Sequence, residues 1–241
     1  MPRISIIIAT FNAAKTLRTA LDSVCSLQMK DWECIIVDGA SRDNTIDIVK
    51  QYCEKDSRFR YISEPDDGIY EAFNKGWKMA YGEWIHYLGA DDRLTPDGLN
   101  DLLESVEDFS IVSGNVYLVY DDGRVKLNPS KGFGGCHQGK LMKRSLLMEF
   151  GGFNTKYKIL ADKDLVIRIK NQGFPIKNIN TCVAYFSLSG VSQSFNTIWK
   201  RAKENFYIYR ADESTRYPLW KTTCIYVRSL LSALKHKYER K

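Results

Sequence analysis

The first hundred residues alternate short apolar runs with stretches whose apolar side chains recur at helical spacing. The apolar, β-branched runs predict strands at 4–9, 32–38, 59–63 and 84–88. The stretches between them predict helices at 15–27, 43–54 and 69–80. Because runs such as ISIII and CIIV are almost continuously apolar, the pattern predicts an α/β fold with a parallel sheet covered by helices on both faces.

The second half of the chain is patterned less regularly. Thr95 and Pro96 predict a helix start, with a capping hydroxyl and a proline at the first helical position. Asp121-Asp122-Gly123 predicts the turn of a hairpin over 116–127. Beyond it we expect a glycine-rich loop at 131–135, a strand-like KLMK segment, a turn at Gly151-Gly152, a helix from residue 161, strands at 175–178 and 181–188, and two closing helices.

Polar side chains follow each of the four predicted strands. The carboxyl ends of parallel strands meet at one edge of a sheet, where open α/β sheets bind their ligands, so these side chains predict one binding site. In chain order they are Thr10 and Asn12, then Asp38, then Glu64 and Asp66, and finally Asp91 and Asp92.

Length and composition fit one α/β domain with a basic tail. The chain has 241 residues, of which 44% are hydrophobic and 27% charged, as in ordinary globular proteins. The net charge is +6, but residues 200–241 alone carry +7, with 11 Lys and Arg against four acids. The basicity therefore belongs to the tail.

The tail has two interpretations. Ile225, Leu230, Leu231 and Leu234 lie among Lys and Arg residues, as in an amphipathic helix on an anionic membrane surface. The other interpretation is a helix packed on the body with a solvated charged face. Basic charge also attracts nucleic acid, but no other feature supports that partner, so we expect no nucleic acid.

The six cysteines and the short apolar runs indicate the cellular compartment in which we expect the protein. None of the cysteines forms a CxxC pair, which disfavours zinc and thioredoxin-like chemistry. No apolar run approaches the roughly 20 residues that span a bilayer, and the run at 4–9 is too short for a signal sequence. We therefore expect a cytoplasmic protein with free thiols, either soluble or peripheral on the cytoplasmic face of the membrane.

Asp91 and Asp92 form an acidic pair directly after the fourth predicted strand. Adjacent carboxylates repel one another, and a divalent cation that prefers oxygen ligands relieves the repulsion. Mn²⁺ and Mg²⁺ fit such ligands, and a cation there can also hold a nucleotide diphosphate. The alternative is a turn in which Asp92 only accepts hydrogen bonds from backbone amides.

Asp162 is a second candidate for chemistry because it lies at the start of a predicted helix. The helix dipole and the free amides favour the ionised carboxylate that a proton acceptor needs. The alternative is a simple helix cap. Asp164 lies about 200° around the helix axis, so both carboxylates cannot face one ligand. His137 and Gln138, which follow the glycine-rich loop, either line the site or serve the structure.

Five segments resemble, in order and spacing, the motifs of family 2 inverting glycosyltransferases with the GT-A fold, of the bacterial surface-polysaccharide type. The resemblance covers roughly residues 3–190 and rests on SIIIATFNAAKTLRTALDSV, IIVDGASRDNT, SEPDDGIYEAFNKG, HYLGADDRLTP and ADKDLVIRI. It implies that Thr10 and Asp38 meet the nucleotide. It also implies that Asp91 binds the metal and that Asp162 is the catalytic base.

The remaining candidates join the same site. Similar family members carry a His-Gln pair at His137 and Gln138, which implies a role in binding the sugar or the acceptor. We expect the other strand-end residues to contribute to the nucleotide-sugar site, Asp92 also to the metal: Asn12, Glu64, Asp66 and Asp92.

Three positions depart from the family pattern. Gly89 stands where many members have the first acid of an LDADD-like string, and Phe73 stands in place of a frequent Arg. Ala161 replaces the Glu that precedes the base in many members. These departures put one metal or nucleotide contact in doubt and leave the base itself in place.

The resemblance implies transfer of a sugar from a nucleotide sugar, with UDP favoured, to a glycan or lipid-linked acceptor by metal-assisted single displacement. It implies a GT-A domain over 1–193, with a nucleotide-binding half at about 1–98 and an acceptor-binding half at about 99–193, followed by a basic helical extension over 194–241. A nucleotidyltransferase and a non-catalytic nucleotide-sugar-binding protein are the alternatives. A dehydrogenase is disfavoured because ATFNAAKT replaces the glycine-rich turn after the first strand.

Overall fold

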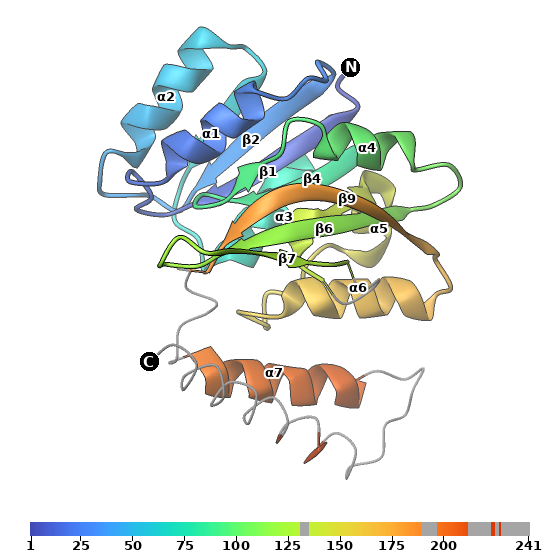
Figure 1. Cartoon of the computed structure of the whole chain (residues 1–241). Helices are drawn as coiled ribbons and strands as arrows, with labels where there is room; N and C mark the ends of the chain where they lie inside the picture. The colour runs from blue at the N-terminus through green and yellow to red at the C-terminus, as the bar shows by residue number, and fades with distance from the viewer. Residues whose placement is uncertain (131–134, 189–196, 212–222, 225–226, 228–241) are drawn as a thin grey trace.

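The structure is a computed structural model that describes residues 1–130, 135–188, 197–211, 223, 224 and 227. Within these residues, nine strands form one mixed sheet, and seven α-helices lie around it (Figure 1). The predicted α/β class is therefore confirmed.

The N-terminal half of the sheet consists of four parallel strands. They are β1 (Ile4–Thr10), β2 (Trp32–Asp38), β3 (Phe59–Ser63) and β4 (Trp84–Gly89), in the spatial order β3-β2-β1-β4. The helices between them are α1 (Leu17–Cys25), α2 (Thr45–Lys55) and α3 (Ile69–Met79). The parallel strands predicted from the apolar runs are confirmed, with ends within one residue of the predicted ones.

Burial on both faces explains why these strands are so apolar. Ile6 and Ile8 of β1 pack in one apolar cluster with Leu17 of α1. Ile7 points to the opposite face, where it packs in a second cluster with Phe73 of α3. The strand order reverses at β1, whose neighbours are β2 and β4, so the carboxyl end of β1 lies at the point where α/β sheets bind ligands.

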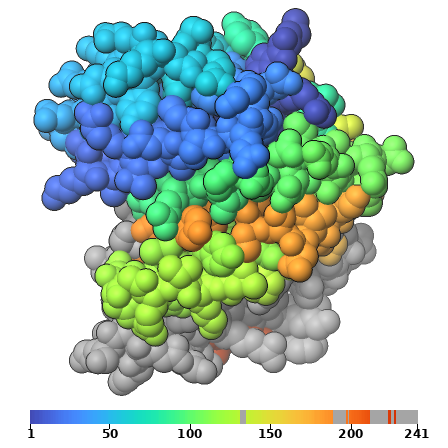
Figure 2. Space-filling view, turned by 45° about the horizontal axis from the view of Figure 1, so that its top comes forward, coloured from blue at the N-terminus to red at the C-terminus, as the bar shows by residue number. Residues whose placement is uncertain are grey.

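The second half of the chain extends the sheet with strands of mixed direction. Its elements are β5 (Arg93–Leu94), α4 (Gly98–Glu104), β6 (Ile111–Val119), β7 (Val125–Asn128), the 3-10 turn His137–Gly139, β8 (Lys140–Lys143), α5 (Arg144–Phe150), α6 (Ala161–Asn171), β9 (Ile176–Ser187) and α7 (Ile198–Ala211). The sheet continues from β4 as β8-β6-β9-β5, and β7 pairs with β6. Figure 2 shows the β6–β7 hairpin (yellow-green) and β9 (orange) at the surface beside the blue N-terminal half.

Several predictions for this half are confirmed. β6 and β7 form the predicted antiparallel hairpin, and the KLMK segment is strand β8. Gly151 and Gly152 both have φ of +70° and end α5 in the predicted turn. α6 begins at Ala161, as expected. In Figure 1, α6 lies below the sheet and α7 lies below α6.

Other predictions for this half are wrong. α4 begins at Gly98, and the Thr95 hydroxyl does not cap it but donates to the Cys182 carbonyl oxygen at 2.6 Å, because β9 passes beside it. The two strands predicted at 175–178 and 181–188 are one strand, β9, whose register against β6 shifts between Ser113 and Val116. Helix α5 was not predicted.

Part of the predicted organisation lies outside the described residues. This applies to the glycine-rich loop except Gly135, and to most of the second closing helix. It also applies to the apolar tail residues Ile225, Leu230, Leu231 and Leu234.

Candidate active site

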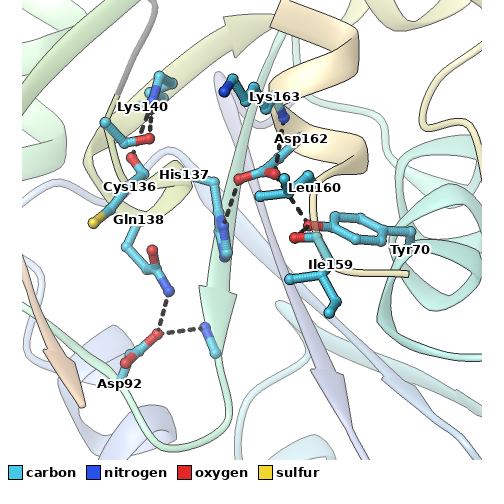
Figure 3. Close-up of polar contacts among 12 residues, drawn as sticks. Tyr70, Asp92, Cys136, His137, Gln138, Lys140, Ile159, Leu160, Asp162 and Lys163 are labelled. Atoms are coloured by element: carbon cyan, nitrogen blue, oxygen red, sulfur yellow. Dashed lines mark hydrogen bonds and ion pairs between the residues drawn. The ribbon is translucent and has the colours of Figure 1, made fainter. Parts of the chain in front are cut away.

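The carboxyl ends of the parallel strands meet the start of α6 and the 3-10 turn His137–Gly139. Figure 3 shows how Gln138 reaches Asp92 and how His137 reaches Asp162 across this junction. The structure therefore brings together the acidic pair, the His-Gln pair and the predicted base, although these groups come from three separate parts of the sequence.

Both oxygens of the Asp162 carboxylate have protein neighbours. Oδ1 accepts hydrogen bonds from the Lys163 backbone N–H at 2.8 Å and from the Tyr70 hydroxyl at 3.1 Å. Oδ2 lies 3.5 Å from His137 Nδ1. The residue that caps α6 is Leu160, so Asp162 lies inside the first turn and is not a simple helix cap.

Asp162 is held as an ionised carboxylate. Burial pushes its pKa upward, but the hydrogen bond and charge of His137, followed by the charge of Lys140, outweigh burial and hold the pKa below its ordinary value. The Asp162 side chain keeps 26% of its exposure, so a small ligand can reach it. An accessible carboxylate that is ionised at neutral pH is what a proton acceptor requires.

His137 lies between Asp162 and the acidic pair. Its ring meets the fully buried ring of Phe73 edge-on, with the centroids 5.6 Å apart. When the ring is protonated, its charge lowers the pKa of Asp91 and of Asp92, as it does for Asp162. Its buried Nε2 atom has no hydrogen-bond partner among the described residues. One imidazole therefore couples the two acidic groups electrostatically.

Asp92 is buried, and both oxygens of its carboxylate accept hydrogen bonds from other groups of the protein. Oδ2 accepts hydrogen bonds from Gln138 Nε2 at 2.7 Å and from the Gly89 N–H at 3.2 Å. Oδ1 accepts one from the Ser187 N–H at 2.8 Å. Burial and the charge of Asp91 raise the pKa of Asp92 to about 6. Asp92 thus joins β4, β9 and the 3-10 turn, which is the role that the alternative interpretation of the pair gave it.

Asp91 has a different environment. Within the described part of the chain, its carboxylate accepts a hydrogen bond only from its own backbone N–H, and burial raises its pKa. A half-buried carboxylate without an Arg or Lys partner is destabilised in its charged form, and a bound cation reduces that destabilisation. Asp91 is therefore the member of the pair that is available to a ligand.

The donor set at this turn fits a divalent cation that is shared with a ligand. The described residues contain no cluster of three His, Cys, Asp or Glu side chains that would hold a metal alone. Mg²⁺ at nucleotide sites takes one or two carboxylates from the protein and completes its shell with phosphate oxygens and water. Asp91, with Asp92 behind it, matches that arrangement.

Gly89 gives the acidic pair its space. A Cβ atom at this position would lie 2.5 Å from Asp92 Oδ2 and 3.0 Å from Asp91 Oδ1. Contacts this short between a carbon and an oxygen force the carboxylates to move. Gly89, which departs from the family pattern, therefore leaves the two carboxylates room to lie where they do.

Thr10, Asn12 and Asp38 lie together at the ends of β1 and β2. Asp38 is fully buried and accepts hydrogen bonds from the Ser41 N–H at 2.9 Å and from the Ser41 and Ser63 hydroxyls at 2.5 and 2.7 Å. The Asn12 N–H donates to Ser41 Oγ at 2.8 Å, so Asn12 and Asp38 hold one loop. The buried Thr10 hydroxyl has no hydrogen-bond partner among the residues described.

The two acids after β3 have different surroundings. Asp66 lies over Gly39 at the end of β2, where a Cβ on Gly39 would meet Asp66 Oδ2 at 2.9 Å. Burial raises the pKa of Asp66, and the charge of Asp38 adds to the effect. Glu64 is 47% exposed and pairs with Lys75 of α3 at 2.9 Å. The structure therefore brings Asp66 to the strand ends and turns Glu64 toward α3.

Tyr70 and Lys140 as neighbours of Asp162, and Phe73 as the ring packed against His137, could not be predicted from the sequence. Tyr70 and Phe73 lie three residues apart on one face of α3, and that spacing alone indicates only a core position. Asp164 faces away, as helix geometry predicted, and its Oδ2 atom lies 2.9 Å from Arg168 Nε.

A hollow of about 420 Å³ lies at the opposite, amino end of the strands. Its two arginines already have acidic partners, because Arg58 pairs with Asp56 and Arg60 pairs with Glu33. Its lining holds none of the predicted site residues: it consists of Met1, Pro2, Lys30, Asp31, Trp32, Glu33, Ser57, Arg58, Arg60 and Tyr81. The carboxyl end of the sheet remains the candidate active site.

Two solved structures share the fold of this chain. The S. aureus TarS 1–349 structure in complex with UDP-GlcNAc matches 97% of this chain and 72% of its own, with a TM-score of 0.69 and 16% identity. The mannosyltransferase PcManGT from Pyrobaculum calidifontis, in complex with GDP-Man and Mn²⁺, matches 100% of this chain and 76% of its own, with a TM-score of 0.71 and 17% identity. The fold is thus the GT-A fold of glycosyltransferases.

Sequence comparison defines the family. The Glycosyl transferase family 2 model matches residues 5–166. A PGL/p-HBAD biosynthesis glycosyltransferase of Mycobacterium tuberculosis is 32% identical over 80% of each chain. The putative teichuronic acid biosynthesis glycosyltransferase TuaG of Bacillus subtilis is 28% identical over 98% of each chain. The chain belongs to glycosyltransferase family 2, and it is an enzyme of that class. None of the described helices is both long and apolar enough to cross a membrane.

Proposed function

We propose that this enzyme transfers a sugar from a nucleotide sugar, with a UDP-sugar favoured, to a hydroxyl of a glycan or lipid-linked acceptor, with inversion at the anomeric carbon. The observation that carries the proposal is the ionised, accessible carboxylate of Asp162, coupled through His137 to the acidic turn. The UDP-GlcNAc bound by TarS and the teichuronic acid role in the name of TuaG support the classes of donor and acceptor.

The nucleotide is expected at the ends of β1 and β2. The buried Thr10 hydroxyl needs a hydrogen-bond partner, and a ribose or base supplies one. Asp66 has a raised pKa, so a donor group of the ligand stabilises its charged form. Asp38 and Asn12 shape the loop beneath the nucleotide through Ser41. Glu64, which faces Lys75, makes no direct contact in this proposal.

A divalent cation, Mn²⁺ or Mg²⁺, is expected on the Asp91 carboxylate together with the diphosphate of the donor. When bound, the ion neutralises the charge that develops on the leaving diphosphate. Asp92 keeps its three hydrogen bonds and fixes the turn that presents Asp91. The Mn²⁺ in the PcManGT complex supports this choice of ion.

Asp162 acts as the base through Oδ2, because Oδ1 already accepts two hydrogen bonds. The acceptor hydroxyl gives its proton to Oδ2 while its oxygen forms a bond to the anomeric carbon. The bond between that carbon and the diphosphate oxygen breaks in the same step. The nucleoside diphosphate leaves from the face opposite the attack, so the configuration inverts. His137 and Gln138 line the space between the base and the acidic turn, where the transferred sugar is expected.

The chain is proposed to have two functional parts. The glycosyltransferase domain covers 1–193, with its nucleotide half at about 1–98 and its acceptor half at about 99–193, and the basic extension covers 194–241. On α7, Trp199 and Tyr207 are 60% and 50% exposed and lie near Lys200 and Lys203. Exposed aromatic and basic side chains suit the interface of an anionic membrane, where a lipid-linked acceptor would be met.

The test is a screen of nucleotide sugars for Mn²⁺-dependent hydrolysis, in which water replaces the acceptor. We expect a nucleoside diphosphate and a free sugar from at least one donor. Release of pyrophosphate would instead identify a nucleotidyltransferase. Tight binding of a donor without any turnover would identify a non-catalytic nucleotide-sugar-binding protein.

A further inference from the structure

One carboxylate of helix α7 holds the loop that leads into the active-site helix α6. Glu204 Oε1 accepts a hydrogen bond from the Lys158 N–H at 2.8 Å. Glu204 Oε2 accepts hydrogen bonds from the Ile159 and Leu160 N–H groups at 3.0 and 2.9 Å. Three successive backbone N–H groups that converge on one anion form a concave anion site. Here the anion is a side chain from about 45 residues further along the chain.

The loop held by Glu204 ends at the proposed base. Leu160 caps α6, and Asp162 is the second residue of that helix. The Ile159 carbonyl oxygen lies 2.6 Å from the Tyr70 hydroxyl, and the same hydroxyl lies 3.1 Å from Asp162 Oδ1 (Figure 3). A hydroxyl has one proton, so the Tyr70 hydroxyl shares its hydrogen bond between the Ile159 carbonyl oxygen and Asp162 Oδ1. A shift of the Ile159 carbonyl therefore changes the strength of the hydrogen bond to Asp162.

A second contact from α7 holds the other side of Asp162. Lys163 Nζ lies 2.5 Å from Asn205 Oδ1 and 4.4 Å from the centre of the Tyr209 ring. Residues on both sides of Asp162 are therefore fixed by adjacent positions of α7. The family model ends at residue 166, so this support comes from a part of the chain outside the matched segment.

We propose that Glu204 is a positioning residue for the base Asp162, so that α7 completes the active site. This inference rests on the proposed function, in which Asp162 accepts the proton of the acceptor. Loss of the Glu204 carboxylate frees three N–H groups, and the loop with its Ile159 carbonyl then shifts relative to Tyr70. A displacement of about 1 Å in a reacting group can lower a rate by roughly 100-fold.

The alternative is that Glu204 only fastens α7 to the body. Two variants of the full chain separate these roles. Glu204→Gln keeps the shape of the side chain but replaces one of its two acceptor oxygens with an amide donor. Ile208→Ala removes a buried side chain of the same helix and leaves the Glu204 carboxylate in place.

The experiment measures Mn²⁺-dependent hydrolysis of the nucleotide sugar, UDP affinity, thermal melting and amide hydrogen exchange over 156–165. We expect Glu204→Gln to lower kcat roughly 30-fold to 100-fold, to speed exchange at 158–160, and to leave the donor KM and the UDP affinity within about twofold. We expect Ile208→Ala to lower the melting temperature and to keep kcat below that temperature.

A double-variant cycle tests whether Glu204 acts through the base. In an Asp162→Asn background, Glu204→Gln should cause no further loss of kcat, because the group that it positions is gone. A full additional loss, or a kcat of Glu204→Gln within about threefold of wild type, overturns the inference. If the wild-type enzyme hydrolyses no nucleotide sugar, the proposed function fails and the inference fails with it. An active wild type with an unaffected Glu204→Gln variant refutes the inference alone.

Discussion

The two ends of the same parallel strands hold their carboxylates in opposite ways. At the amino end, Glu33 is buried beside Ser5, Tyr81 and Arg60. Its Oε1 accepts hydrogen bonds from the Ser5 hydroxyl and the Tyr81 N–H, both at 2.6 Å, and its Oε2 pairs with Arg60 at 2.5 Å. Burial pushes the pKa of Glu33 upward, but these partners outweigh burial and lower it. The charge of Glu33 is neutralised within the chain.

At the carboxyl end of the strands, burial has the larger effect on the pKa of the carboxylates. It raises the pKa of Asp91, and together with the charge of Asp91 it raises the pKa of Asp92 to about 6. No Arg or Lys of the described residues pairs with either carboxylate. A buried carboxylate that pairs with an Arg or Lys of the chain stabilises the fold. A buried carboxylate without such a pair is suited to bind a ligand that carries positive charge.

The largest expected effect is the loss of the proposed base. Asp162→Asn should lower kcat for donor hydrolysis roughly 1,000-fold, because an amide cannot accept the proton. The UDP affinity, measured by calorimetry, should remain. Asp164→Asn, two residues along the same helix and paired with Arg168, is the matched control and should keep kcat. Similar losses in both variants would assign the effect to the helix and not to the base.

The next effect concerns the cation. Asp91→Asn should lower kcat about 100-fold at saturating donor and raise the Mn²⁺ concentration needed for half-maximal rate, because the ligand oxygen loses its charge. Asp92→Asn should leave that Mn²⁺ concentration close to wild type and lower the melting temperature, since Asp92 holds three protein N–H groups. If Asp92→Asn shifts the Mn²⁺ requirement more than Asp91→Asn does, the assignment within the pair is reversed.

A smaller effect is expected from substitutions of two glycines, one at the carboxyl end of β4 and one just before its amino end. Gly89→Ala places a Cβ 2.5 Å from Asp92 Oδ2, which moves the acidic turn and should lower kcat about tenfold. Gly82→Ala places a Cβ 2.7 Å from the Ser5 backbone nitrogen at the amino end. It should lower the free energy of unfolding and leave the kcat of the folded enzyme unchanged. Equal kcat losses in both variants would remove the functional distinction between the ends.

The smallest effect on activity is expected at Glu33. Glu33→Gln should keep kcat and lower the free energy of unfolding by about 2 kcal/mol at pH 7, because charged hydrogen bonds to Ser5, Tyr81 and Arg60 are lost. The folded pKa of Glu33 lies below the unfolded value of about 4.3, so its stabilisation is present above that pH. It is lost as the pH falls through the folded pKa. Urea unfolding should therefore show the difference from wild type narrowing below about pH 4, and a constant difference would contradict this account.

The N-terminal half could be predicted from the sequence because each strand obeys one rule. Strands buried on both faces are almost continuously apolar, and polar residues begin where the strands end, as at Thr10 and Asp38. The second half mixes parallel and antiparallel pairs, so no single pattern covers it. Thr95 illustrates the difficulty: its hydroxyl has a distant partner in β9 instead of the local helix end that its position suggests.

The candidate site could be predicted only in part for a similar reason. Asp91, Asp92 and Asp162 carry charge at element ends, which is visible in the sequence. Tyr70 and Glu204 reach the Asp162 region through contacts about 90 and 45 residues apart, and helical spacing gives no sign of such partners. Which of Asp91 and Asp92 is available to a ligand likewise depends on the Ser187 N–H of β9, because folding brings this group to the Asp92 carboxylate.

The most direct test of the convergence at the carboxyl end is a crystal structure with Mn²⁺ and UDP, in which anomalous scattering locates the metal. We expect one Mn²⁺ ion coordinated by an Asp91 carboxylate oxygen and by the diphosphate. The Asp162 carboxylate should face the same space across His137. A metal and diphosphate bound away from Asp91, or a bound donor site that Asp162 does not face, would show that these acids do not form one active site.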